Sequence, residues 1–568
     1  MLATDILLRN YEQDSDRTFL RLLHLRRPVE TYTYRQVLDR AAQWWGVYES
    51  LNIKQGEHVV IILKHSLDLY AAFLGALLHG SIPAMFAFPS QKFSEQEYFA
   101  TIGELLENAD AQVLVTYTDL ATQLCTLTPD AVQGRAVCTA DRLAGIRPES
   151  LVERRAMVGS RSVDRVAFLQ YSSGTTGIKK GVAISHRALL WQIDHYAHSI
   201  EARSSDCIVS WLPLYHDMGL IACFLLPFLK AIPLVAMCPF EWAQRPAMWT
   251  TAVSQHRATL SWLPNFAYNH MVRSITDAEL QQCDLSSLRG VVNCSEPILP
   301  DTHRRFVERF SRFGFSPSAL ATSYAMAENT FAVTSGGFGA SVKEDAIDGD
   351  AFARTGRAIP VNADHPRAKI IVSSGTLLAD TTAEIVTANG PTGDREVGEI
   401  VLRSPCLLTE YHGNHAATAR SLQDGRYFTG DLGYTADGEL FVVGRKNDLV
   451  IVGGVNIHPQ DVEAIVHGVD GAIPGRCVVF GAPRTDLGTE MLVVLAETRE
   501  ADAAARARMR KDIYEAIVAR VGVVPGVIKI VDHMSLRKSS SGKMSRSMNR
   551  ERFLAGDDFT ASKKEAAA

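Results

Sequence analysis

The sequence predicts an α/β protein in which a large N-terminal domain of mostly parallel sheets and helices ends in a small β-rich subdomain. A small α+β C-terminal domain follows. With 568 residues the chain is too long for one hydrophobic core, so two or more domains are expected. Strands alternate with helices up to about residue 367, and short strands separated by turns come next. We predict a large domain at 1–444, its β-rich subdomain at about 368–444, and a small domain at 445–568.

Seven short apolar runs predict the strands of the parallel sheets. Each is bounded by glycine, proline or polar residues, which is typical of buried strands. The runs lie at 58–63, 112–117, 166–171, 207–212, 232–237, 258–263 and 290–295. Helical segments lie between them, at 68–80, 185–200 and 245–256. This alternation favours parallel pairing, because a helix can return the chain to the start of the next strand.

One apolar stretch, Leu69 to Phe88, approaches the length of a membrane span. Gly80 and Pro83 interrupt it, and Pro83 would break a helix. We predict a buried helix that ends near Gly80 and a core strand after it. No stable membrane insertion is expected.

The pattern of predicted elements changes at about Ala368, where short strands replace the alternation of strands and helices. Short strands are predicted at 368–375, 383–390, 398–405 and 426–445. The residues TADG at 435–438 predict a hairpin turn. After Arg445, further apolar runs, a helix at 501–522 and a Ser/Gly-rich segment near the C-terminus indicate a separate α+β unit.

The composition is that of a soluble globular protein from a reducing compartment. Hydrophobic residues make up 46% of the chain and charged residues 21%. The net charge of −5 provides no overall attraction to nucleic acid. The nine cysteines form no C-x-x-C pair, which favours free, mostly buried thiols. The N-terminus lacks the pattern of a signal peptide, so a cytoplasmic location is expected.

The segment YSSGTTGIKKG, residues 171–181, follows a predicted strand and combines glycines, hydroxyl side chains and two lysines. Gly174 and Gly177 let the backbone approach a ligand closely. Backbone N–H groups, hydroxyls and an ammonium together suit a polyphosphate. The loop is no Walker A motif, since no Gly-Lys-Ser/Thr is present. A solvent-exposed flexible loop with incidental lysines is the alternative.

This loop resembles the signature loop of the adenylate-forming superfamily, which comprises acyl-CoA synthetases, peptide-synthetase adenylation domains, luciferases and fatty acyl-AMP ligases. Six further segments resemble that superfamily's motifs, in the correct order along the chain. They are SWLPLYHDMGLI (210–221), NCSEP (293–297), YAMAE (324–328), YFTGDLG (427–433), GRKNDLVIVGGVNIHPQDVE (444–463) and SSSGKMSR (539–546). The resemblance implies the adenylate-forming fold and the activation of a carboxylic acid by ATP and Mg²⁺ to acyl-AMP, with release of pyrophosphate.

The resemblance also implies a nucleotide site. The phosphates would be held by Ser172, Ser173, Gly174, Thr175, Thr176, Gly177 and Lys180. The adenine would lie beside Ser295, Glu296, Pro297, Tyr324, Ala325 and Met326. Asp431 and Arg445 would contact the ribose, although Asp431 could also stabilise a turn after Gly430 and Arg445 could be a structural ion-pair partner.

Three further residues have roles implied by the resemblance. Glu328 would bind Mg²⁺, an ion that prefers oxygen ligands. Lys543 would be catalytic, with its ammonium between the incoming carboxylate and the α-phosphate. The alternative is that Lys543 is one of several basic residues of the C-terminal tail. His216 would lie near the substrate carboxylate, or else be a structural histidine. A hinge at Lys446, Asn447 and Asp448 would let the small domain rotate.

Within the superfamily, the segments 210–221 and 263–269 resemble the fatty acyl-AMP ligase branch. The interval from Glu328 to Asp431 is long for a CoA-using enzyme, and the excess lies at about 346–373, where that branch has an insertion thought to restrain domain movement. The resemblance implies transfer of the acyl group to an acyl carrier protein, as in polyketide or nonribosomal peptide biosynthesis. An acyl-CoA or aryl-CoA ligase that uses CoA is the alternative.

The substrate and the activity leave further alternatives. Medium- or long-chain fatty acids are expected, with short or aryl acids as the alternative. Four large apolar residues could either line an acyl tunnel or belong to the hydrophobic core: Trp211, Trp242, Trp262 and Phe266. A nucleotide-sensing module without chemistry is a third functional class. The presence of Glu328, Asp431, Arg445 and Lys543 argues against it.

Overall fold

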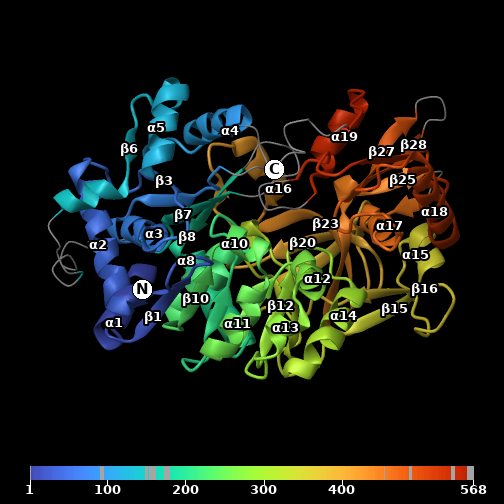
Figure 1. Ribbon diagram of the computed structural model, residues 1–568, viewed down its shortest axis with the longest axis horizontal. Coiled ribbons are helices and arrows are strands. Elements are labelled where there is room, and N and C mark those ends of the chain that lie inside the picture. The colour runs from blue at the N-terminus through green and yellow to red at the C-terminus, as the bar shows by residue number, and fades with distance from the viewer. Residues whose placement is uncertain are drawn as a thin grey trace.

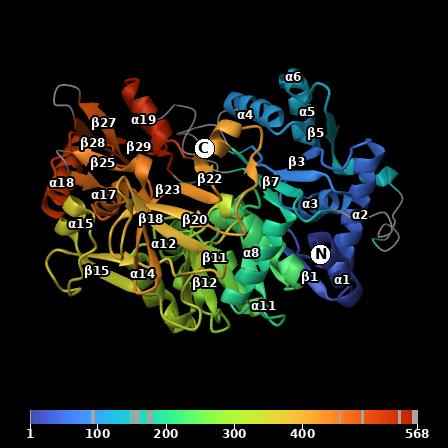
Figure 2. The same cartoon turned by 180° about the vertical axis from the view of Figure 1, so that it is seen from behind.

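A computed structural model describes residues 2–89, 95–146, 151, 162–171, 180–452, 455–484, 489–538 and 544–559. The N-terminal part of the chain, blue in Figure 1, lies at one end of the molecule, and the C-terminal part, orange and red, lies at the other. The view from behind in Figure 2 shows the same arrangement. No helix in the described part of the chain is long and apolar enough to cross a membrane.

The first large sheet has seven strands in the order β13-β12-β11-β9-β10-β1-β2. Every neighbouring pair is parallel except β1 and β2. The strands are β1 (Thr18–Leu23), β2 (Glu30–Thr33), β9 (Ile208–Ser210), β10 (Leu234–Met237), β11 (Leu260–Leu263), β12 (Gly290–Cys294) and β13 (Leu320–Ser323).

The second large sheet also has seven strands, in the order β21-β8-β7-β4-β3-β5-β6. They are β3 (His58–Ile62), β4 (Ile82–Met85), β5 (Ala111–Thr116), β6 (Ala136–Cys138), β7 (Val166–Tyr171), β8 (Gly181–Ser185) and β21 (Glu410–Tyr411). The pairs from β6 to β7 are parallel, whereas β7–β8 and β8–β21 are antiparallel. All seven predicted strands are present, which confirms the expected α/β class with largely parallel sheets.

Helices cover these sheets. They are α1 (Ala3–Gln13), α2 (Tyr34–Ser50), α3 (Leu67–His79), α4 (Glu95–Asn108), α5 (Thr118–Leu127), α6 (Pro129–Val132), α8 (His186–Ser199), α9 (Leu226–Lys230), α10 (Pro239–Gln244), α11 (Ala247–His256), α12 (Asn265–Ser274), α13 (Asp277–Leu280) and α14 (Pro300–Phe310). Most of them pack on one large core, and α4, α5 and α6 pack on a second, smaller core. Short 3₁₀ turns are η1 (Ala140–Gly145), η3 (Ser311–Phe313), η4 (Pro317–Ala319) and η5 (Ala327–Asn329), while η2 (Met218–Leu225) is a π-helical segment.

The burial of strand β3 on both faces explains why its sequence is a nearly continuous apolar run. Val59 and Ile61 belong to the core that joins both sheets, whereas Val60 and Ile62 face the smaller core under α4 and α5. Both faces of the strand are therefore buried, as is usual in a parallel sheet. The following helix α3 ends at Gly80, whose φ of 92° is left-handed, and β4 begins at Ile82. The predicted helix and core strand in this apolar stretch are confirmed.

The β-rich region forms a separate antiparallel sheet. Its strands are β18 (Thr382–Thr387), β19 (Gly390–Pro391), β20 (Gly398–Arg403), β22 (Leu422–Gln423), β23 (Arg426–Ala436) and β24 (Glu439–Arg445), with α16 (His415–Ser421) beside them. The predicted hairpin turn joins β23 and β24, and both Asp437 and Gly438 have positive φ. Two small strand pairs accompany this sheet: β14 (Thr334–Ser335) with β17 (Thr376–Leu377), and β15 (Glu344–Asp348) with β16 (Ala368–Val372), which flank α15 (Gly349–Thr355).

The C-terminal part has its own three-stranded sheet, β27-β28-β29. Its elements are η6 (Lys446–Asp448), β25 (Val450–Val452), β26 (Val455–Ile457), α17 (Pro459–Val466), β27 (Cys477–Arg484), β28 (Thr489–Thr498), α18 (Ala503–Val521), β29 (Val527–Asp532) and α19 (Arg546–Leu554). Val479 faces the core shared with α17 and α18, while Val478 and Phe480 face the core shared with Phe553 of α19. This alternation places helices on both faces of the sheet. The boundary near residue 445 between a large and a small domain remains a prediction.

Candidate active site

Three of the predicted nucleotide-binding residues meet at the hairpin β23–β24. Asp431 lies opposite Arg445 in this hairpin, and Tyr324 follows the end of β13. The Tyr324 hydroxyl donates to Asp431 Oδ2 over 2.6 Å, and Arg445 Nε donates to Asp431 Oδ1 over 3.1 Å. Burial raises the pKa of Tyr324, and the Asp431 carboxylate raises the pKa of Arg445. The Arg445 side chain is 55% exposed. A buried acceptor beside an accessible cation is suited to a ligand that brings hydroxyl and phosphate groups.

A second cluster surrounds Glu328. The Tyr411 hydroxyl donates to Glu328 Oε1 over 2.9 Å and lies 2.9 Å from the Tyr427 hydroxyl. The Lys180 ammonium lies 4.7 Å from the centre of the Tyr411 ring, a cation–π arrangement. Burial raises the pKa of the Glu328 carboxyl. A nearby cation would favour the ionised form of this partly buried carboxylate.

Backbone pairing brings this second cluster together. Tyr411 in β21 lies opposite Val182 in β8, and His412 N donates to Gly181 O over 2.7 Å. On the other side, Leu408 N donates to Glu328 O over 2.8 Å. The strand that follows the glycine-rich loop is therefore joined to the Glu328 turn through residues 408–412.

The glycine-rich loop connects the paired strands β7 and β8. Tyr171 lies opposite Gly181, and a Cβ at Gly181 would lie 3.2 Å from the Tyr171 ring. The loop therefore begins and ends at adjacent points of the sheet, next to Lys180. The predicted phosphate-binding residues Ser172, Ser173, Gly174, Thr175, Thr176 and Gly177 lie outside the described residues.

The residues predicted to contact adenine lie at the ends of β12 and β13. Ser295 has a φ of 67°, in the left-handed region. Glu296 Oε2 accepts a hydrogen bond from Phe266 N over 2.9 Å, in the first turn of α12. Glu296 therefore has a capping contact that sequence reasoning did not include. Pro297 follows it and is exposed.

The turn after Tyr324 is held by backbone contacts. Ala325 pairs with Ala332, and Met326 N donates to Phe331 O over 2.8 Å. Ala325 and Met326 are both partly buried. The tight return of the chain presents Tyr324 and Glu328 to the two clusters described above.

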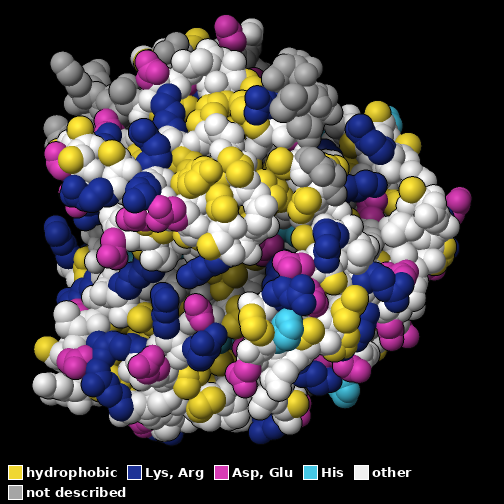
Figure 3. Space-filling model, turned by 90° about the vertical axis from the view of Figure 1, so that its right-hand side faces the viewer, with side chains coloured by type: hydrophobic (Ala, Val, Ile, Leu, Met, Phe, Trp, Pro, Cys, Tyr) yellow, Lys and Arg dark blue, Asp and Glu magenta, His cyan; other side chains and the backbone are white. Residues whose placement is uncertain are grey.

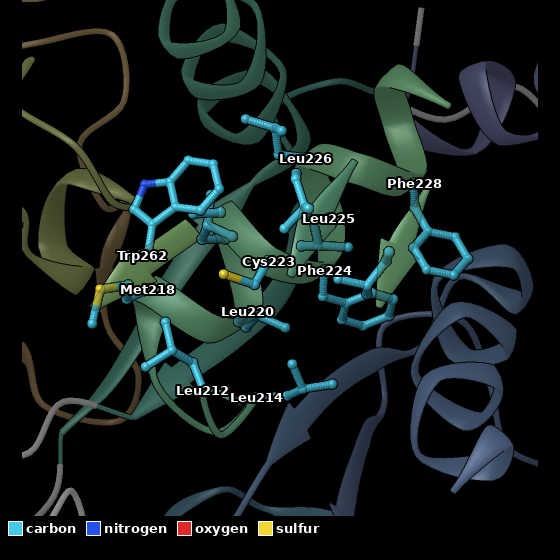
Figure 4. Close-up of a cluster of buried hydrophobic side chains, with 14 of the residues drawn as sticks. Leu212, Leu214, Met218, Leu220, Cys223, Phe224, Leu225, Leu226, Phe228 and Trp262 are labelled. Atoms are coloured by element: carbon cyan, nitrogen blue, oxygen red, sulfur yellow. The ribbon is translucent and has the colours of Figure 1, made fainter. Parts of the chain in front are cut away.

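His216 lies between β9 and η2, and its ring centre is 4.8 Å from that of Tyr215. Asp217 Oδ1 accepts from Met218 N over 2.8 Å at the start of η2. Gly219 is required here, because a Cβ would lie 2.2 Å from the Pro213 carbonyl oxygen. Figure 4 shows the apolar side chains of this segment pointing into the surrounding core. The buried segment holds the histidine loop in place.

The predicted catalytic Lys543 lies outside the described residues, but both of its flanks are described. Lys538 and Met544 form an isolated β-bridge on either side of it. Arg546 donates to Asp448 Oδ2 over 2.5 Å and to Glu463 Oε1 over 2.8 Å. The segment after Lys543 is thereby attached to the predicted hinge.

No group of three or more His, Cys, Asp or Glu side chains that could hold a metal ion occurs within the described part of the chain. Glu328 is a single, partly buried carboxylate that accepts a hydrogen bond from Tyr411, whose ring contacts Lys180. Mg²⁺ is commonly bound by one or two protein carboxylates together with substrate phosphates. The donor set therefore fits Mg²⁺ that arrives with a nucleotide.

A cavity lies between the two large sheets, next to the histidine loop. Its lining residues are mostly apolar: Leu63, His65, Leu69, Tyr70, Met85, Phe86, Phe88, Ser210, Leu212, Pro213, Leu214, Tyr215, Cys223, Ala236, Met237 and Pro239. Trp211, Trp242, Trp262 and Phe266 do not line it. Trp211 and Trp242 stack on each other at 3.7 Å, and Trp262 Nε1 donates to Tyr196 Oη over 2.7 Å. Of the two alternatives for these four side chains, plain core or an acyl tunnel, a role in the wall of this cavity is not observed.

Comparison with known proteins identifies the family. The family model for AMP-binding enzymes matches residues 7–412. The chain belongs to the AMP-binding enzyme family. This AMP-binding enzyme has the fold of adenylate-forming enzymes, as the sequence predicted, and its general chemistry is ATP-dependent activation of an acid as an adenylate.

Several relatives of this AMP-binding enzyme are similar along most of their length. A putative acyl-CoA synthetase of Caulobacter vibrioides is 30% identical over 532 residues, 93% of this chain and 91% of that protein. The long-chain-fatty-acid–AMP ligase FadD32 of Mycolicibacterium smegmatis is 30% identical over 548 residues, 88% of this chain and 85% of that protein. A solved structure from a study of fatty acyl-adenylate ligases of E. coli and L. pneumophila has a TM-score of 0.89 at 27% identity, and the match covers 98% of each chain.

Sequence reasoning missed two tyrosines of the site, Tyr411 and Tyr427. Tyr411 lies outside every motif quoted above, and Tyr427 opens the YFTGDLG motif, in which only Asp431 was assigned a role. Their contacts depend on the pairing of β21 with β8, which joins residues more than two hundred positions apart. A pairing of this kind leaves no local pattern in a single sequence.

Proposed function

We propose that this AMP-binding enzyme joins a fatty acid to the α-phosphate of ATP and passes the acyl group to the phosphopantetheine thiol of an acyl carrier protein. The observation that supports the first step best is the convergence of Tyr324 and Arg445 on Asp431, at 2.6 and 3.1 Å. A carboxylate held from two sides keeps lone pairs for the two ribose hydroxyls. Ser295, Glu296, Pro297, Ala325 and Met326 would surround the base.

The phosphate chain would extend from this ribose site toward Lys180 and the loop 172–177. Displacement at phosphorus depends on positioning and on charge neutralisation. Lys180 supplies a positive charge 4.7 Å from the Tyr411 ring, and Tyr411 orients the Glu328 carboxylate. Mg²⁺ bound at Glu328 would neutralise charge on the leaving pyrophosphate.

In this proposal Lys543 supplies the ammonium that stabilises the charge building between the carboxylate and the α-phosphate. Its loop would be delivered by the C-terminal part, which turns about Lys446, Asn447 and Asp448. The ion pair between Arg546 and Asp448 supports this role, because it couples the lysine loop to the hinge. His216 would lie beside the substrate carboxylate, next to the apolar cavity.

The choice of a carrier protein as acceptor rests on the segment at about 346–373. Lys369 Nζ lies 2.6 Å from Asp461 Oδ2, and the rings of Phe352 and His458 are 5.8 Å apart. These contacts join the inserted segment to α17 and the residue before it, on the side of the molecule seen in Figure 3, where positive and negative side chains intermingle. A rotation of the C-terminal part would have to break them, which disfavours the rearrangement that CoA transfer needs.

The names of relatives favour more than one acceptor. A relative from Moorena producens, 27% identical over 567 residues, is a medium-chain-fatty-acid–[acyl-carrier-protein] ligase. The Caulobacter relative is instead a putative acyl-CoA synthetase, so an acyl-CoA ligase is the second candidate. For the acid, a 4-hydroxyphenylalkanoate adenylyltransferase of Mycobacterium tuberculosis, 30% identical over 558 residues, supports testing aryl acids beside fatty acids.

The test supplies ATP, Mg²⁺ and a panel of fatty and aryl acids, and measures pyrophosphate release. Each active acid is then offered to either CoA or a holo acyl carrier protein, and the thioester is measured by mass. We expect acid-dependent pyrophosphate release and a thioester on the carrier protein. Efficient formation of acyl-CoA would contradict the proposed acceptor, and the absence of pyrophosphate release with every acid would contradict the adenylation itself.

A further inference from the structure

The cavity beside the histidine loop is placed where α/β proteins bind their substrates. Its lining comes from the carboxyl ends of β3, β4, β9 and β10 and from the residues that follow them. In open α/β sheets, ligands bind outside the carboxyl ends of the parallel strands. This cavity is shared by two such sheets, and it lies next to His216, beside which we place the substrate carboxylate.

One polar side chain in this apolar wall is not satisfied by the protein. His65 lines the cavity and is partly buried, and its buried Nε2 atom has no hydrogen-bond partner within the described ranges. Burial lowers the pKa of His65 to about 4, so the ring is neutral near pH 7. The Ala236 carbonyl hydrogen-bonds the ring. A carbonyl only accepts, so the nitrogen facing it is the protonated Nδ1, and Nε2 retains a lone pair.

Two hydroxyl groups complement this acceptor. Tyr70 and Tyr215 also line the cavity. Ser210 accepts from Leu212 N over 3.0 Å. Leaving buried polar groups without partners is costly, so such groups often mark a ligand site. A hydroxyl on the ligand matches the set, because it can donate to Nε2 of His65 and accept from a tyrosine.

The sheet order separates His65 from the nucleotide site. Ala236 belongs to β10, whereas Ser295 follows β12, and β11 and β9 lie between these strands. Three strand spacings correspond to ~14 Å. This spacing separates His65 from the predicted adenine site, so the cavity suits the acyl part of the substrate rather than the nucleotide.

We propose that the cavity binds the far end of a carboxylic acid that ends in a hydroxyl group, and that His65 accepts the hydrogen bond from this hydroxyl. The inference rests on the proposed adenylation and narrows its substrate class to ω-hydroxyalkanoic or hydroxyarylalkanoic acids. His65 is then a specificity-determining residue, and it takes no part in the chemistry.

The test compares matched acids in the pyrophosphate-release assay with the full-length enzyme. Each pair differs only in the terminal hydroxyl: an alkanoate with the ω-hydroxyalkanoate of equal length, and a phenylalkanoate with its 4-hydroxyphenyl counterpart. We expect kcat/KM to favour one hydroxylated member by about tenfold or more. The pair that shows the preference distinguishes an alkyl from an aryl terminus.

His65→Leu should reduce this preference by about tenfold while conversion of the unsubstituted acid persists. The control is His256→Leu, since His256 also has a buried Nε2 without a partner among the described residues but does not line the cavity. If His65→Leu does not fold, His65→Phe replaces it with a ring of similar size.

The outcomes separate this inference from the proposed function. Equal rates for both members of each pair in the wild-type enzyme would overturn the inference and leave the adenylation intact, as would an unchanged preference in both His65 variants. If His65 Nε2 binds only an ordered water, both members of each pair should react at equal rates. The absence of pyrophosphate release with every acid would overturn both.

Discussion

The Tyr411 hydroxyl donates a hydrogen bond to Glu328 Oε1 over 2.9 Å. The same hydroxyl lies 2.9 Å from that of Tyr427, and the Tyr411 ring lies beneath the Lys180 ammonium. This contact joins the exit of the glycine-rich loop to the carboxylate for which we propose a role in binding Mg²⁺.

Tyr411→Phe removes the donor to Glu328 and leaves the ring beneath Lys180. We expect the Mg²⁺ concentration for half-maximal pyrophosphate release to rise about tenfold or more, because a hydrogen bond to a charged group contributes ~1.5–3 kcal/mol. The Michaelis constant for the acid should stay unchanged. Tyr427→Phe is the matched control, since it leaves the bond to Glu328 in place. Equal effects of the two variants would contradict the prediction.

Asp431→Ala removes the acceptor shared by Tyr324 and Arg445. The Michaelis constant for ATP should rise by tenfold or more through loss of the ribose contacts. The buried Tyr324 hydroxyl would lose its partner, which lowers the free energy of unfolding by about 1–3 kcal/mol. Urea unfolding measures the second effect. Asp437→Ala, in the exposed turn of the same hairpin, should change neither quantity.

Lys543→Ala should reduce acyl-AMP formation at least a hundredfold, because an ammonium at the site of developing charge contributes at this level. Calorimetry should show that ATP still binds. Lys511→Ala serves as control, since Lys511 is exposed on α18. Retained adenylation in Lys543→Ala would rule out the catalytic role.

Lys369→Ala breaks the ion pair with Asp461 at the junction of the inserted segment and α17. We expect CoA-dependent thioester formation to rise several-fold while acid-dependent pyrophosphate release is unchanged. Lys343→Ala, which removes an ion pair to Glu439 beside the β-rich sheet, is the control. If Lys369→Ala combined with Phe352→Ala leaves CoA use unchanged, these contacts do not restrict the acceptor.

Stability should fall as the pH is lowered from about 6.5 to 4. Burial lowers the pKa of four histidines to about 4: His65, His303, His458 and His467. The unfolded chain takes up protons near the ordinary histidine pKa of about 6.5, whereas the folded chain does not. Each of these histidines therefore stabilises the folded state above about pH 6.5. Below that pH, the free energy of unfolding falls by ~1.4 kcal/mol per pH unit for each histidine.

Urea unfolding at pH 7 and pH 5 measures this dependence. His467→Gln should make it shallower, because the variant removes one group that binds a proton only in the unfolded chain. His198→Gln, at an exposed position of α8, should leave it unchanged. A stability that does not vary between these pH values would contradict the assignment of neutral buried histidines.

Local rules explain how much of the fold the sequence could predict. The run at 59–63 is apolar at every position because β3 is buried on both faces, and the helix before Gly80 ends where glycine adopts a left-handed φ. The turn at 435–438 needs positive φ at Asp437 and Gly438. Each of these features is specified by neighbouring residues, so periodicity and turn chemistry were sufficient.

The sequence by itself also determined the family, since seven ordered motifs identify it, and most of the polar groups assigned to the nucleotide. Only the tertiary structure decided which groups touch. Tyr411 reaches Glu328 through the pairing of β21 with β8, and His65 meets Tyr215 across a cavity that two sheets enclose. Such contacts depend on strand order and packing between distant segments, and the free energy of that packing has no local signature in the chain.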